Sequence, residues 1–256
     1  MIPLRDSIPS RTIPFTNYSV IAICTIAFLM QVTSADRGDR IAEQFGMVPA
    51  RLSDASAEPV IEQKVAVQTP TGVEVRVLRR ELAAAVIPAW MTLITCMFLH
   101  GGWMHFLGNM WFLYVFGDNV EDRLGPLGYL LLYLGTGIAA SLSHYFTGPL
   151  SPIPTIGASG AIAGVMGAYA WLYPHARVQA ILPIPIFLHV FVLPAPWFLG
   201  IWFAIQTYSG ISATAAGAVT GVAWWAHIGG FVAGAAIALV IGRSPFGHDA
   251  VSARRF

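Results

Sequence analysis

Residues 221–242 read GVAWWAHIGGFVAGAAIALVIG, a run without a single Asp, Glu, Lys or Arg. A transmembrane helix needs roughly 20 mostly apolar residues, so this run is long enough to cross a bilayer. Small residues recur in it at four-residue spacing, and such stripes let the backbones of two membrane helices touch. One histidine, His227, lies inside the run. Because polar side chains are costly in lipid, this histidine indicates a functional site as well as a span.

The composition of the whole chain agrees with a membrane protein. The chain has 256 residues, of which 56% are hydrophobic and 11% charged, whereas a soluble domain usually carries about 25% charged residues. Of the 27 charged side chains (14 basic plus 13 acidic), 15 lie between Thr33 and Leu82. This distribution excludes an ordinary soluble globule and a disordered chain. A net charge of +1 without a basic cluster also argues against nucleic acid as a partner.

The apolar runs predict an all-α polytopic membrane protein with six transmembrane helices in a lipid bilayer. They lie at about 17–33, 103–118 (preceded by a further apolar stretch at 87–99), 127–146, 158–173, 186–208 and 221–242. The fifth is the least regular, because four prolines crowd its beginning. We therefore expect a cytoplasmic N-terminal segment (1–16), a six-helix domain (17–242) and a cytoplasmic C-terminal tail (243–256).

The placement of Lys and Arg predicts the orientation. With six spans, the N-terminus, the two even-to-odd loops and the C-terminus share one side and carry seven arginines, whereas the opposite short loops, about 147–157 and 209–220, carry no Lys or Arg. Short loops rich in Lys and Arg stay in the cytoplasm. We therefore expect both termini to be cytoplasmic, in a membrane that we take to be the bacterial inner (plasma) membrane.

The loop between the first and second helices, 34–102, is long and would be external. Within it, residues 64–78 (KVAVQTPTGVEVRVL) alternate between apolar and polar on either side of TPTG. This pattern predicts a β-hairpin with a glycine-containing turn. A solvated external decoration is the plainer interpretation of the hairpin, and recruitment of a substrate is the alternative.

The second, fourth and sixth helices carry polar side chains near their starts. The second opens with His100, His105 and Asn109, the fourth with Ser159, and the sixth has His227. All three helices begin on the outer side, so these groups lie in one layer below the outer interface. Small-residue stripes on the fourth and sixth helices predict close packing that brings His227 beside Ser159.

A serine beside an imidazole is a nucleophile with its general base. The start of the fourth helix supplies free backbone N–H groups. His105 and Asn109 lie four residues apart on one helix face, and both can donate to a developing oxyanion. Each residue alone has an ordinary structural explanation, such as bonding within its own helix or joining two helices. Their coincidence in one layer favours a Ser–His hydrolytic site that opens to the outer side.

Two other intramembrane chemistries fit the sequence poorly. A metalloprotease of the HExxH type requires a histidine followed by glutamate, and no histidine here is so placed. An aspartyl mechanism requires two embedded aspartates, but Asp118 and Asp122 fall at the cytoplasmic end of the second helix. We expect neither a metal nor a cofactor. His144, near the outer end of the third helix, is interpreted as a packing or interfacial residue.

Four motifs together resemble the rhomboid family of intramembrane serine proteases: HGGWMHFLGN (100–109), GDNVEDRLG (117–125), GASGAIAG (157–164) and AHIGGFVAG (226–234). The resemblance runs from about residue 13 to 242 and implies a six-helix rhomboid bundle with a Ser–His dyad and no third acid. It implies catalytic roles for Ser159 and His227, an oxyanion hole from His105 and Asn109, and structural support from His100, Gly157, Gly160, Gly230, Gly234, Glu121 and Arg123. The last two match a pair that ties the 1–2 loop to the region of the second and third helices.

The resemblance implies an endopeptidase that cleaves transmembrane segments of membrane proteins near the outer interface. The loop 209–220 and a short fifth helix would be the substrate gate. Many family members carry a tyrosine four residues after the serine, stacked on the histidine, and here that position is Ala163. Either Tyr169 or a tryptophan compensates, or the imidazole is held less tightly. The alternative is a catalytically silent relative that binds transmembrane helices for quality control or trafficking. A transporter or channel would show paired intramembrane charges, which this sequence lacks.

Overall fold

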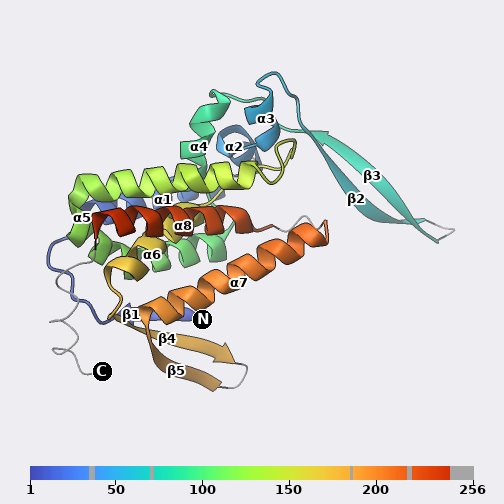
Figure 1. Ribbon diagram of the computed structural model, residues 1–256. Coiled ribbons are helices and arrows are strands. Elements are labelled where there is room, and N and C mark those ends of the chain that lie inside the picture. The colour runs from blue at the N-terminus through green and yellow to red at the C-terminus, as the bar shows by residue number, and fades with distance from the viewer. Residues whose placement is uncertain (35–37, 70–71, 185–186, 218–220, 243–256) are drawn as a thin grey trace.

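A computed structural model of the chain describes residues 1–34, 38–69, 72–184, 187–217 and 221–242. It is mainly helical, and Figure 1 shows the long helices running side by side in one bundle. They are α1 (Phe15–Val32), α5 (Trp103–Tyr145), α6 (Ser159–Leu172), α7 (Ala195–Ala215) and α8 (Trp224–Ile241). Within the described residues, α1, α5 and α8 are the three helices that by length and composition could each cross a membrane. The tail predicted at 243–256 lies outside the described residues.

Helix α5 joins the predicted second and third helices into one element of 43 residues. Its backbone leaves the helical region at Gly125, where φ is 71° and ψ is 168°, directly before Pro126. A positive φ favours glycine, and proline fits the first turn of the helix that follows. The chain turns back at this point, because His105 and His144, near opposite ends of α5, line the same cavity. The two arms therefore match the two separate helices expected from the sequence.

Helix α6 lies at the centre of the bundle, and most of its residues from Gly160 to Leu172 are buried. Its contact with α8 is made through glycines. A Cβ atom added at Gly230 would overlap the carbonyl of Gly160, and one added at Gly234 would overlap the carbonyl of Gly164. The backbones of the two helices therefore touch, as small-residue stripes allow.

The prediction of a fifth helix over 186–208 was wrong at its beginning. This region instead holds two antiparallel strands, β4 (Arg177–Ile184) and β5 (Phe187–Pro194), and β4 also pairs with the N-terminal strand β1 (Ile2–Asp6). The prolines that crowd this region stop a helix but are tolerated at strand ends and edges. Helix α7 begins after Pro194 and continues to Ala215, so most of the predicted loop 209–220 is helical; residues 218–220 lie outside the described part of the chain.

The segment between α1 and α5 contains the predicted hairpin, with longer strands than the sequence pattern indicated. Strands β2 (Val60–Thr69) and β3 (Gly72–Glu81) pair over their whole length, and the turn at 70–71 lies outside the described residues. The hairpin projects away from the bundle (Figure 1). The rest of the loop consists of short elements that pack over one end of the bundle: α2 (Gly38–Phe45), α3 (Pro49–Ser53), η1 (Ala89–Met91), α4 (Thr92–Thr95) and η2 (Cys96–Phe98).

The base of the hairpin is fixed to the loop by Glu43. This buried carboxylate accepts a hydrogen bond from the Ala83 N–H, at 2.8 Å. It also forms an ion pair with the Arg80 guanidinium, at 2.6 Å. Arg51 donates to the backbone carbonyls of Glu43 and Ala83, both at 2.6 Å. Burial alone would raise the pKa of Glu43, but the bonds from Arg80 and Ala83 outweigh burial and hold the pKa below its ordinary value.

Candidate active site

Ser159 is the first residue of α6, and His227 is the fourth residue of α8. The Ser159 Oγ and the His227 Nε2 are 2.8 Å apart, which is hydrogen-bond distance. Both helices begin at the same end of the bundle, so the free N–H groups at the start of α6 face the same region as the imidazole. The structure thus brings together the two residues that the sequence placed in one layer.

The glycine contact between α6 and α8 sets this separation. Gly230 is one turn beyond His227, and it packs on the carbonyl of Gly160, the residue after Ser159. A Cβ atom on Gly160 would in turn come within 2.6 Å of the Ala140 Cβ on α5. The two helices therefore cannot come closer without a backbone collision, and this contact sets the minimum separation of the serine and the histidine.

His105 lies against Gly157, just before α6. The Gly101 N–H donates to the His105 Nδ1 at 3.3 Å, which leaves the ring proton on Nε2. A Cβ atom on Gly157 would be 2.7 Å from that Nε2 and 3.6 Å from the Ser159 Oγ, and the φ of Gly157 is +131°. Glycine is required here both by the backbone and by the approach of the imidazole. The N–H of His105 therefore points to the neighbourhood of the serine.

Asn109 lies on the same face of α5, one turn after His105. Its side chain is buried, and its Nδ2 has no hydrogen-bond partner within the described part of the chain. A buried amide donor without a partner is costly, so such a group is rare unless a ligand completes it. The unpaired N–H₂ group of Asn109 borders the same cavity as Ser159.

The cavity in front of the serine has a volume of about 680 Å³. The polar groups that reach it include Ser159, His227, His105, Asn109 and His144. His144, which the sequence indicated as a packing or interfacial residue, lines this cavity, and its buried Nδ1 has no partner among the described residues. The remaining lining is small or apolar: Gly101, Met104, Ile153, Pro154, Thr155, Ile156, Gly221, Val222 and Ala223.

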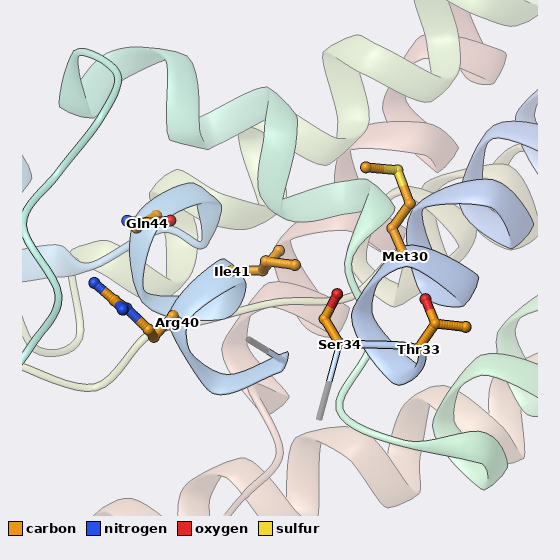
Figure 2. Close-up of a pocket in the computed structure, with 6 residues that line it drawn as sticks. All are labelled: Met30, Thr33, Ser34, Arg40, Ile41 and Gln44. Carbon is orange, nitrogen blue, oxygen red and sulfur yellow. The ribbon is translucent and has the colours of Figure 1, made fainter. Parts of the chain in front are cut away.

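A second hollow, of about 420 Å³, lies between the end of α1 and α2 (Figure 2). The residues that line it are Met30, Thr33, Ser34, Arg40, Ile41 and Gln44. The described residues that line it provide hydroxyl groups but no imidazole or carboxylate to activate one of them. Within the described ranges, no three His, Cys, Asp or Glu side chains gather closely enough to hold a metal ion. The cavity at Ser159 is therefore the better candidate for chemistry.

His100, one of the predicted supporting residues, is bonded to the end of α1. His100 is buried among the rings of Phe28, His105 and Phe106. Its backbone N–H donates to the Gln31 Oε1 at 3.0 Å, and its carbonyl accepts from the Gln31 Nε2 at 3.2 Å. The segment that precedes α5 is therefore tied to the end of α1.

Glu121 has a different partner from the one expected. Its carboxylate accepts the backbone N–H groups of Thr16, at 2.9 Å, and Asn17, at 2.7 Å, and so caps the start of α1. The expected tie to the 1–2 loop was wrong, because that loop follows the other end of α1. Arg123 forms no ion pair with Glu121 in the described chain, and its buried Nε has no partner there.

Sequence reasoning missed two residues of α7 that contact the histidine. The His227 Nδ1 lies 2.8 Å from the Gln206 Oε1, and the Trp202 ring lies over the imidazole with centroids 5.8 Å apart and planes 36° apart. Of the two suggested substitutes for the missing family tyrosine, Tyr169 is bonded to Asp6 instead. A polar amide inside an apolar membrane run was the signal that could have singled out Gln206.

Comparison with known proteins agrees with the motifs. The family model described as "Rhomboid domain" matches residues 88–244. The chain is 31% identical to Rhomboid-like protein 11, chloroplastic, of Arabidopsis thaliana over 160 residues, which is 62% of this chain and 55% of that protein. It is 40% identical to Putative rhomboid protease YdcA of Bacillus subtilis over 83 residues (32% of this chain, 41% of that protein). With Rhomboid protease GluP of the same organism, identity is 33% over 150 residues (59% and 26%). The chain thus spans about half or less of these relatives.

Proposed function

Because this chain belongs to the rhomboid family, we propose that it is an intramembrane serine endopeptidase that cleaves transmembrane segments of membrane proteins near the outer interface. One observation carries the proposal: the 2.8 Å hydrogen bond between the Ser159 Oγ and the His227 Nε2, inside a cavity that the unpaired Asn109 amide also borders. The apolar helices and the family identify an integral membrane protein with a helical bundle.

In the proposed mechanism Ser159 is the nucleophile and His227 the general base. The Oγ attacks the scissile carbonyl carbon while its proton moves to the His227 Nε2. The oxyanion accepts hydrogen bonds from the His105 Nε2–H, the Asn109 amide and the Ser159 backbone N–H. When the C–N bond breaks, the imidazolium gives its proton to the leaving amine. A water molecule then hydrolyses the acyl-enzyme by the same route, with His227 again as the base.

We further propose six membrane crossings: α1, the two arms of α5, α6, α7 and α8. Both termini are then cytoplasmic and the cavity opens to the outer side, as the arginine distribution favours. We assign the protein to the bacterial plasma membrane. Reporter fusions after Arg123 and at the C-terminus should give cytoplasmic signals, and a fusion near residue 60 should give an external one. A cytoplasmic signal at residue 60 would contradict this topology.

The entry route for a substrate is proposed to lie along α7. This helix contacts the histidine through side chains, and its surface carries exposed large residues such as Trp197, Ile205 and Tyr208. The gate is therefore assigned to the whole helix Ala195–Ala215 rather than to a loop at 209–220.

The decisive experiment is labelling of the purified protein with a fluorophosphonate probe, together with cleavage of a transmembrane substrate. Ser159→Ala and His227→Ala should each abolish both signals, and the double variant should lose little more, because the two residues act as a unit. Ser143→Ala is the matched control, since the Ser143 hydroxyl bonds the Ala139 carbonyl of its own helix.

A catalytically silent relative that binds transmembrane helices is the second candidate. It would bind a labelled substrate helix without cleaving it, and the wild-type protein would not react with the probe. Retention of activity in Ser159→Ala would instead exclude the serine mechanism and leave another nucleophile to be found.

A further inference from the structure

Gln206 is a buried amide on α7, in a chain whose residues 178–242 contain no Asp, Glu, Lys or Arg. A polar side chain inside a membrane helix is costly unless it is paired. Its Oε1 lies 2.8 Å from the His227 Nδ1, the ring nitrogen that faces away from Ser159. The amide thus reaches the imidazole edge at which a carboxylate stands in a Ser-His-Asp triad.

The two hydrogen bonds of the imidazole depend on each other. A neutral imidazole has one N–H donor and one bare nitrogen acceptor. If His227 is to accept the proton of Ser159 at Nε2, its own proton must be on Nδ1, and that N–H donates to the Gln206 Oε1. With the proton on Nε2, the ring would donate to the serine and could not take its proton. With its Oε1 at this edge, Gln206 can accept only from an Nδ1–H and so favours the reactive tautomer.

Helix α7 also fixes the plane of the ring. Trp202 lies one turn before Gln206, on the same face of the helix, and its indole packs against the imidazole with ring centroids 5.8 Å apart and planes tilted by 36°. Trp224 meets the ring from another direction, at 6.1 Å and 87°. One helix, α7, thus orients the imidazole through the ring contact of Trp202 and the hydrogen bond of Gln206.

We propose that Gln206 is a positioning residue: it holds His227 in the tautomer and orientation that accept the Ser159 proton, in the place of the third acid that the sequence lacks. The expected loss of kcat rests on the proposed protease function, whereas the tautomer and orientation of His227 do not. Because Gln206 is on α7, the orientation of the base depends on the docking of this helix, whereas the distance between α6 and α8 does not.

The test compares three variants of the full-length protein in detergent micelles and in vesicles. Gln206→Met keeps the length of the side chain and removes the acceptor. Gln206→Glu restores an acceptor at the same position. Thr207→Val is the matched control, because the Thr207 hydroxyl bonds the Phe203 carbonyl of its own helix. The first readout is the ¹⁵N spectrum of His227, which distinguishes Nδ1–H from Nε2–H and is assigned with His227→Gln.

We expect His227 to be protonated on Nδ1 in the wild type, in Ser159→Ala and in Thr207→Val, and to shift toward Nε2–H in Gln206→Met. In the cleavage assay, Gln206→Met should lower kcat by about 10²-fold with KM nearly unchanged. This is less than the ~10⁴-fold loss that a wrong tautomer causes in a Ser-His-Asp triad, because a neutral amide contributes no charge. Gln206→Glu should recover most of kcat.

The proposal is overturned if wild-type His227 is protonated on Nε2, a result that needs no variant to fold. It is also overturned if Gln206→Met keeps the wild-type tautomer and kcat, or if Gln206→Glu fails to restore either in a folded protein. Failure of the proposed function has a different signature: the wild type neither cleaves nor labels, while the Nδ1–H tautomer and its loss in Gln206→Met are still observed.

Discussion

Helix α8 is held on its two flanks by different kinds of contact. Toward α6, Gly230 and Gly234 rest on backbone carbonyls, and no side chain separates the two helices there. Toward α7, the contact is made by aromatic rings, Phe231 with Phe203 and Trp202, and by the bond from His227 to Gln206. Backbone contacts cannot yield by rotating a side chain, whereas ring contacts can be remade.

This difference assigns separate tasks to the two flanks. The α6 flank, together with α5, sets the positions of Ser159, His227 and the proposed oxyanion donors His105 and Asn109. The α7 flank orients the imidazole and can move without separating Ser159 from His227. The predictions below test whether the two flanks differ in this way.

We call the α6 side of α8, with α5, the fixed flank and the α7 side the adjustable flank. The largest expected effect is on the fixed flank, at Asn109. If its unpaired amide completes the oxyanion hole, Asn109→Ala should lower kcat by about 10²–10³, or ~2.7–4 kcal/mol. KM and the melting temperature should change little, because the interaction forms mainly in the transition state. Asn119→Ala is a suitable control, since Asn119 is bonded to Asp6 and Asp118 and should affect stability instead. A matching loss of stability in Asn109→Ala would make it a structural residue worth roughly 0.6 kcal/mol.

The next effect concerns the backbone contact itself. Gly230→Val places a branched side chain where the Gly160 carbonyl lies, and overpacking of this kind costs about 1–3 kcal/mol, or more where the backbone cannot relax. Both the melting temperature and probe labelling of Ser159 should fall. Gly200→Ala on α7 is the matched control, because nothing lies within 4 Å of a Cβ atom there. Normal labelling and stability in Gly230→Val would show that the α6 flank is not rigid.

Much of the fixed flank could be predicted from the sequence, because hydropathy and small-residue spacing act along one helix. The expected spans 17–33, 158–173 and 221–242 lie within three residues of α1, α6 and α8. The nearness of Ser159 to His227 could also be predicted, because both lie near helix starts on the same side and small-residue stripes bring their helices together. Their catalytic role stays a prediction, which the probe experiment tests.

The adjustable flank could not be predicted in the same way. Strand β4 pairs with β1, so that Ile181 lies opposite Ile2, and no local pattern reveals a partner so distant in sequence. Short apolar runs with prolines are ambiguous between helix and strand. For Gln206 the sequence indicated a helix but not its rotation, which the ring contacts of α7 determine. The sequence did not place His144 at the cavity, because its arm of α5 returns there only through the bend at Gly125.

A smaller effect is expected from loosening the adjustable flank. Phe231 lies on α8, one turn beyond His227. The Phe203 ring of α7 stacks on it with ring centroids 4.7 Å apart. Phe203→Ala should cost about 1 kcal/mol of stability, the usual scale of an aromatic pair, while Ser159 remains reactive toward the probe. Val232→Ala, at a position on α8 that is 53% exposed, is the control for a lost side chain facing lipid. If Phe203→Ala abolished labelling as Gly230→Val does, the two flanks would not differ.

The smallest effect is expected at the hairpin, outside both flanks. Glu62 pairs directly with Arg79 across β2 and β3, so residues 63–78 can be replaced by Asn-Gly, which closes a two-residue turn between them. The excised part of β3 is exposed along its length, and the anchor of Glu43 with Arg80 and Ala83 remains. The melting temperature and probe labelling should therefore be unchanged, within the ~0.5 kcal/mol typical of surface changes.

Arg80→Ala, which leaves the buried Glu43 without its cation, should destabilise the loop more than the whole deletion does. If the shortened protein labels normally but cleaves a membrane substrate more slowly, the hairpin recruits substrate. A loss of folding would instead show that it packs into the external loop and helps to hold both flanks together.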